Sequence, residues 1–309
     1  MAADDQPSLP SLESVRRAVL EIWPEHESFL AKSLPGDEVA NLRHADQVAA
    51  LILSLMGESP KTVIEDYRWT CERLLEEELY FRRNGDYRIK DFAVAKAEVY
   101  ENAEFMSRYV NGLLLSHLLW ANHRAVLRFF TEHFLPGNPA GFTHLEVGPG
   151  HGLFLHLAAS HPACASALGW DISATSVEHT RQCLERLGAP QTARVERQDI
   201  MAATDSDITF DSVVISEVLE HLEDPQAALL SLKKVMAPNG RIFINVPVNS
   251  PAPDHIYLLE TPEQAFQMIE DCGFSITDTA CFPATGYSEE RARKLQATLS
   301  CVAIATPAP

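Results

Sequence analysis

The chain has 309 residues, 46% of them hydrophobic, and its 25 basic and 43 acidic side chains give a net charge of −18. This hydrophobic content allows a buried core and excludes collagen-like, low-complexity and disordered classes. The negative charge would repel a phosphate backbone, so we expect neither nucleic acid nor an anionic membrane as a partner.

We expect neither an export signal nor a membrane-spanning segment in this sequence. Its apolar runs fall short of the roughly 18–20 residues that span a bilayer, and Met1 to Asp5 lack the basic stretch of a secretory signal. The six cysteines are scattered without a Cys-x-x-Cys pair, which predicts reduced thiols instead of disulfides or a zinc site. We expect a cytoplasmic protein.

The first part of the chain has a helical pattern throughout and is predicted to form a cap or lid domain over residues 1–137. A segment rich in proline and glycine, Leu135 to Gly141, is the predicted linker. Helices are predicted at about 11–23, 37–57, 60–82 and 91–134, the last with a break near 100–104 or at Gly112.

Residues 138–309 alternate between strand and helix patterns, which predicts an α/β fold with a doubly wound, mostly parallel, Rossmann-like sheet. The last two of its seven strands leave no room for a full crossover helix between them, so we expect the final strand to be antiparallel. The predicted strands are 144–148, 167–171, 193–196, 212–216, 241–246, 274–281 and 299–305, with helices near 152–160, 174–187, 225–236 and 262–272.

The most informative stretch runs from His144 to Gly152, where a hydrophobic strand enters a glycine-rich turn that opens a helix. Glycines let a ligand approach the backbone, and a helix N-terminus offers free amides. The third glycine of a dinucleotide fingerprint would stand at Leu153. In addition, the carboxylate of Glu146 suits an ammonium better than a pyrophosphate. These two features argue against ordinary NAD binding.

This turn, with its acid-x-Gly-x-Gly-x-Gly form, resembles the first motif of the class I S-adenosylmethionine (SAM)-dependent methyltransferases, and the resemblance covers roughly residues 140–309. It implies SAM as the cofactor. The acid of the turn would meet the methionine amino group, the acid after the second strand the ribose, and the pair after the third strand the adenine. The cofactor-binding residues that we expect are Glu146, Gly148, Gly150, Gly152, Asp171, Ile172, Asp199, Ile200, Ser216, Glu217 and, from the cap, Asn111.

A second motif runs from Glu217 through Glu220 to His221. Its acids and histidine either orient the loop and contact the cofactor, or join His255 in a site for a hard divalent cation. A similar arrangement binds a metal in small-RNA 2′-O-methyltransferases. We expect no metal here, because related enzymes that use none also carry the motif and the net charge argues against an RNA substrate.

Three residues are candidates for catalysis. His255 follows a proline-rich loop and could be a general base, with His221 as an alternative. Tyr109 lies in the cap, where aromatic faces suit a sulfonium cation. Each of these side chains could instead serve only packing. Of the other histidines, His151 is expected beside the cofactor, and His117, His123 and His133 on helix faces or at the surface.

The resemblance implies transfer of a methyl group from SAM to an oxygen, nitrogen or carbon of a small molecule, in a setting of bacterial secondary metabolism. Two alternatives stay open. A methyltransferase-like SAM cyclase would close SAM on itself to azetidine-2-carboxylate and methylthioadenosine. A module that binds SAM without catalysis is the other alternative.

Overall fold

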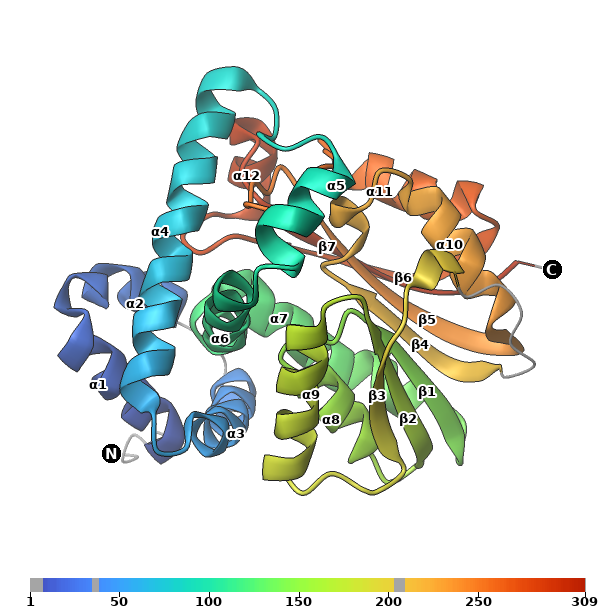
Figure 1. Cartoon of the computed structure of the whole chain (residues 1–309), viewed down its shortest axis with the longest axis horizontal. Helices are drawn as coiled ribbons and strands as arrows, with labels where there is room; N and C mark the ends of the chain where they lie inside the picture. Colours follow the sequence, from blue (N-terminus) through green and yellow to red (C-terminus); the bar gives the residue numbers. More distant parts are fainter. Residues whose placement is uncertain (1–7, 35–38, 203–208, 309) are drawn as a thin grey trace, which may run out of the picture.

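The computed structural model describes residues 8–34, 39–202 and 209–308, and its centre is a seven-stranded sheet in the order β3-β2-β1-β4-β5-β7-β6 (Figure 1). The first five strands pair in parallel, and β7 is antiparallel to both of its neighbours, which confirms the predicted topology. The strands are β1 (Phe142–Val147), β2 (Cys164–Asp171), β3 (Ala193–Arg197), β4 (Phe210–Ser216), β5 (Met236–Val248), β6 (Phe274–Pro283) and β7 (Leu299–Pro307).

The helices between the strands begin where their capping residues stand. The side chains of Ser173, Asp224 and Thr261 each accept a hydrogen bond from a first-turn amide of the following helix. The four predicted helices are present, and α12 occupies part of the segment between β6 and β7. Their bounds are α8 (Leu153–Ala159), α9 (Ala174–Arg186), α10 (Pro225–Lys234), α11 (Pro262–Asp271) and α12 (Glu289–Leu295).

The N-terminal helices gather beside the sheet, coloured blue to green in Figure 1. The predicted break near 100–104 is confirmed, whereas the chain stays helical at Gly112 and breaks again at Trp120, which was not predicted. The helix α2 was not predicted either. The bounds are α1 (Pro10–Ile22), α2 (Glu27–Ser33), α3 (Val39–Met56), α4 (Pro60–Asn84), α5 (Phe92–Ala95), α6 (Ala103–Leu119) and α7 (Ala121–Phe129), with single turns at Pro24–His26, Lys96–Tyr100, Phe130–Phe134 and Leu135–Gly137.

Alternate residues of the central strands pack on opposite faces of the sheet. Val213 and Ile215 belong to the core that contains α10 and α11, while Val214 belongs to the core shared with the N-terminal helices. On that second face the Phe130 ring lies 5.4 Å from the Phe243 ring. The helical region therefore covers one face of the sheet directly, and the division at residue 137 stays a prediction. None of the described helices is long and apolar enough to cross a membrane.

Candidate active site

A cavity of about 370 Å³ lies at the carboxyl ends of β1, β2 and β4, beneath the helical region. This volume falls within the range of small-molecule sites, roughly 300–1,000 Å³. Its walls come from the glycine turn, from the loops that follow β2, β3, β4 and β5, and from α6 with the segments on either side of it. Ligands of open α/β sheets bind at this edge.

The glycine turn follows β1 with three left-handed residues, Gly148, Gly150 and Gly152, at φ values of 71°, 53° and 81°. A Cβ atom on Gly148 would lie 2.5 Å from a methyl group of Val218, so only glycine fits there. Glu146 precedes the turn, and its buried Oε2 has no hydrogen-bond partner within the described chain. Burial, together with the charge of Asp171, raises the pKa of Glu146 to about 8. This carboxylate lacks a cation, and a ligand ammonium would supply one.

Asp171 ends β2 on the neighbouring wall of the cavity. Its Oδ1 accepts a hydrogen bond of 2.8 Å from the Ser173 amide, and its Oδ2 accepts a longer one of 3.4 Å from the Gly150 amide. Burial raises the pKa of Asp171 to about 6. Farther along the same wall lie Ile200, which is buried, and Asp199, which is exposed. An apolar side chain beside a carboxylate suits a planar ring that carries an amino group.

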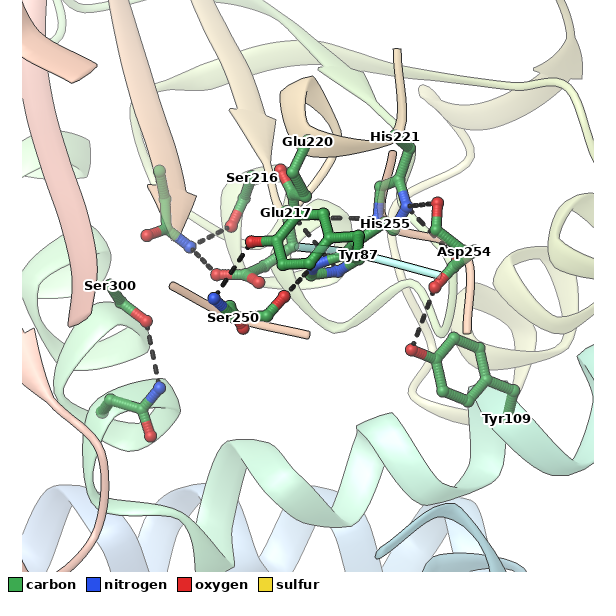
Figure 2. Close-up of polar contacts among 12 residues, drawn as sticks. Tyr87, Tyr109, Ser216, Glu217, Glu220, His221, Ser250, Asp254, His255 and Ser300 are labelled. Carbon is green, nitrogen blue, oxygen red and sulfur yellow. Dashed lines mark hydrogen bonds and ion pairs between the residues drawn. The ribbon is translucent and has the colours of Figure 1, made fainter. Parts of the chain in front are cut away.

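The loop after β4 holds Glu217 in a strained conformation, with a left-handed φ of 54°. Its amide donates to the Asn245 carbonyl, and the Asn245 amide group donates to Ser216 Oγ and Glu217 Oε1 at 3.0 and 2.8 Å (Figure 2). Burial raises the pKa of Glu217 to about 7. The loop thus keeps a carboxylate at the floor of the cavity at the cost of backbone strain.

Asp254 links the helical region to the loop after β5. Its two carboxylate oxygens accept hydrogen bonds from the Tyr100 and Tyr109 hydroxyls at 3.1 and 3.3 Å, and Figure 2 shows Tyr109 pointing toward it. His221 Nδ1 lies 3.1 Å from the Asp254 carbonyl and 3.3 Å from its carboxylate. Because both of these are acceptors, Nδ1 carries the proton and Nε2 of the neutral ring has a free lone pair.

His255 is oriented in the same way, because its Nδ1 donates to the Ser250 carbonyl. The Nε2 atoms of His221 and His255 then lie 3.6 and 3.8 Å from Glu220 Oε1. Glu220 is fully buried, and no donor in the described chain reaches either of its oxygens. The three side chains offer donor atoms within 4.8 Å of one another, so they could hold a divalent cation or share a proton. Glu217, the fourth residue of the predicted alternative, does not belong to this group.

Most of the residues selected from the sequence line the cavity, and two do not. Gly152 lies behind the turn, where a Cβ atom would come within 3.0 Å of Thr180 and Cys183 of α9. Asn111 faces α4, where its amide donates to Asp66 at 2.9 Å. The residues that line the cavity are Tyr109, Glu146, Gly148, Gly150, Asp171, Ile172, Asp199, Ile200, Ser216, Glu217, His221 and His255.

The sequence interpretation missed part of the wall formed by the helical region. His117 and His123 are buried and line the cavity, as does His151, whereas His133 is exposed as expected. Tyr87, which contacts the loop after β5 without lining the cavity, was also missed. Its hydroxyl accepts the Ser250 amide hydrogen at 3.0 Å, and its ring lies 5.8 Å from that of His255. No motif surrounds Tyr87 in the sequence, so only the folded chain reveals this contact.

Comparisons with known proteins agree with this geometry. Residues 145–242 match the family described as "Methyltransferase domain". The ubiquinone biosynthesis O-methyltransferase of Xanthomonas axonopodis pv. citri is 31% identical over 114 residues, which cover 37% of this chain and 46% of that protein. The same-named protein of Coxiella burnetii is 26% identical over 125 residues, 40% of this chain and 51% of the relative. The chain therefore spans about half the length of the curated relatives that it matches.

Among solved structures, the magnesium protoporphyrin IX methyltransferase of Synechocystis, with bound S-adenosylhomocysteine (SAH), aligns with a TM-score of 0.54 at 18% identity. The alignment covers 71% of this chain and 100% of that chain. At this identity the likeness shows a shared fold.

Proposed function

We propose that the chain is a class I methyltransferase that transfers a methyl group from SAM to a small-molecule acceptor, because residues 145–242 match the family described as "Methyltransferase domain". The observation that carries this proposal is that one continuous cavity is lined by the glycine turn, by the acidic residues at the carboxyl ends of the strands and by the helical region. The acceptor would offer an oxygen, nitrogen or carbon nucleophile. The setting that we propose is bacterial small-molecule biosynthesis.

The cofactor fits the chemistry of the walls. The ammonium of SAM would pair with Glu146, which lacks a partner for its Oε2. The ribose hydroxyls would donate to Asp171, and the adenine would lie against Ile200 with its amino group toward Asp199. Ser216 and Glu217 would underlie the methionine part. The sulfonium would then face Tyr109 of α6, with Tyr100 and Trp120 on either side of that helix, and aromatic ring faces favour a cation.

His221 is the general base that we favour among the three catalytic candidates. Asp254 orients its ring and leaves Nε2 free to accept a proton. Burial lowers the pKa of His255 to about 3, so its imidazole is a weak base. The Tyr109 hydroxyl donates to Asp254, and burial raises its pKa well above the usual value. We therefore assign Tyr109 to shaping the cavity.

The reaction is a displacement at carbon. The acceptor nucleophile would form a bond to the methyl carbon as the carbon–sulfur bond breaks and its electron pair returns to sulfur, leaving SAH. An acceptor hydroxyl or amine would lose its proton to His221 Nε2. Because the sulfonium is already activated, the protein contributes mainly by positioning the two reactants in line and by keeping water out under the helical region.

The test is to incubate the protein with SAM, alone and with a panel of small hydroxyl and amine compounds, and to identify the nucleoside product by mass spectrometry. We expect SAH, formed only when an acceptor is present. His221→Ala should lower kcat by about 10²–10⁴-fold, the usual contribution of a general base, while His133→Ala at the exposed surface should leave it unchanged. Methylthioadenosine formed from SAM alone, with an azetidine acid, would instead establish the cyclase alternative.

A further inference from the structure

The cavity is lined by carboxylates, which suit the positive charge of a zwitterionic ligand but not its negative charge. Carboxylates enter it from β1, from the end of β2 and from the loops after β3, β4 and β5, whereas none of the described residues that line it is lysine or arginine. SAM carries a carboxylate as well as an ammonium. Histidines are therefore the lining side chains that could offer that carboxylate a positive charge.

The histidines of the cavity fall into two groups. His221 and His255 already face the carboxylates of Glu220 and Asp254. The other group, which we name the histidine trio, consists of His117 from α6, His123 from α7 and His151 from the glycine turn. The His117 ring lies 4.6 Å from the His151 ring and 5.3 Å from the His123 ring. Within the described part of the chain, no ion pair occupies any of the three.

Hydrogen bonds to two of these rings determine where their protons lie. Ser116 Oγ donates its one hydrogen to the Leu113 carbonyl at 2.7 Å, so it must accept the bond of 2.8 Å from His123 Nδ1. His123 Nε2 is therefore a free acceptor in the neutral ring. His151 Nδ1 accepts the Leu153 amide hydrogen at 3.2 Å, so its Nε2 carries a hydrogen.

The trio is incomplete without a ligand. His117 is 9% exposed, and its buried Nδ1 finds no partner among the described residues. A buried polar atom without a partner is costly unless a ligand or water satisfies it. Burial also lowers the pKa of all three rings, to about 4 for His123 and about 3 for His151, so the rings are neutral while the cavity holds no anion. An anion beside them would raise these pKa values and favour the imidazolium form.

We propose that His117, His123 and His151 form a carboxylate-binding subsite at the end of the cavity next to the glycine turn. His151 donates through Nε2. His117 provides a donor or takes up a proton, and His123, whose Nδ1 hydrogen is bound to Ser116, takes up a proton at Nε2 when the carboxylate enters. The first candidate for the carboxylate is that of SAM, which rests on the proposed function. The second is a carboxylate of the acceptor. In both cases the subsite binds a carboxylate. The two cases differ in whether SAM or the acceptor carries it.

The experiment compares SAM with decarboxylated SAM, which keeps the sulfonium and the amine and lacks only the carboxylate. Isothermal calorimetry of the full chain should show SAM binding at least tenfold more tightly, the size of one hydrogen bond to a charged group. His117→Phe keeps a ring of similar shape, and His151→Asn keeps an acceptor for the Leu153 amide. Each should weaken SAM about tenfold and leave decarboxylated SAM within about twofold. His133→Phe, outside the cavity, should alter neither.

A second experiment tests whether the carboxylate that binds this subsite belongs to the acceptor. The protein is saturated with SAH and titrated with benzoate as a minimal carboxylate. Benzoate binding that His117→Phe abolishes, together with equal affinity for SAM and decarboxylated SAM, would assign the subsite to the acceptor. Equal affinity for the two cofactors without benzoate binding would overturn the subsite and leave the methyltransferase proposal intact. Failure to bind either cofactor would overturn the proposed function itself. The wild-type comparison holds even if a variant fails to fold.

Discussion

The buried carboxyl of Glu146, which we propose binds the ligand, lowers the stability of the ligand-free protein. Its pKa is about 8 in the folded protein against an ordinary 4.5, so the folded state keeps a proton that the unfolded chain releases across that range. The contribution of Glu146 to the stability of the ligand-free protein should therefore be most favourable below pH 4.5 and fall as the pH rises toward 8, by at most about 1.4 kcal/mol per pH unit.

Replacing Glu146 with Gln should remove this cost. In urea unfolding at pH 8, the ligand-free Glu146→Gln variant should be more stable than the wild type by on the order of 1–4 kcal/mol, and the difference should vanish near pH 4.5. Glu185→Gln, on the exposed face of α9, is the matched control. A difference that stays constant with pH would show that the Glu146 carboxyl does not titrate in this window.

Asp171 is the residue on which the placement of the ribose depends. Asp171→Ala should weaken SAM binding by about 1.5–3 kcal/mol, because hydrogen bonds from the ribose to a charged acceptor are lost. Calorimetry measures this loss directly, and Asp271→Ala at the exposed end of α11 serves as its control. An unchanged affinity would mean that the ribose lies elsewhere.

At the scale of whole elements, the contact between α4 and α6 sets how α6 is turned toward the cavity. A Cβ atom on Gly112 would lie 2.0 Å from Thr70 Oγ1 and 2.6 Å from Thr70 Cβ, so the two helices touch where glycine leaves room. Gly112→Ala should lower the free energy of unfolding by about 1–3 kcal/mol through overpacking. In a double-mutant cycle, Thr70→Ala should recover part of that loss. Strictly additive effects of the two changes would contradict direct contact.

For the molecule as a whole, the two tyrosine bonds to Asp254 fasten the helical region over the cavity. Tyr100→Phe and Tyr109→Phe should each cost about 1 kcal/mol of stability, and the double variant more than the sum, because Asp254 is only 3% exposed on its side chain and would keep few partners. Exchange of the backbone amide hydrogens in residues 250–257 should be faster in each single variant than in the wild type, and fastest in the double variant. Tyr257→Phe is the control. Unchanged exchange in the double variant would show that other contacts hold the loop.

The parts of the fold that were predicted correctly depend on neighbours in the chain. Local sequence pattern and local hydrogen bonds determine the strand that ends at Val147, the glycine turn after it, and the start of α10, which Asp224 caps. Asn111 was placed wrongly, and the position of His117 at the cavity was missed, because the rotation of α6 is set by its packing against α4, which residue spacing within α6 does not encode. The same holds for Tyr87, which meets Ser250 only through the tertiary fold.

The strand order β5-β7-β6 imposes a sequence of assembly on the sheet. β6 comes before β7 in the chain, yet within the sheet it pairs with β7 alone, so it has no edge to join until β7 is in place. β6 can therefore join the sheet only after β7 has paired with β5, or together with β7 as a hairpin. This pairing brings together segments that are distant in sequence and raises the contact order of the last step, which slows it. Because β6 pairs with β7 alone, release of β7 from β5 should detach β6 from the rest of the sheet as well.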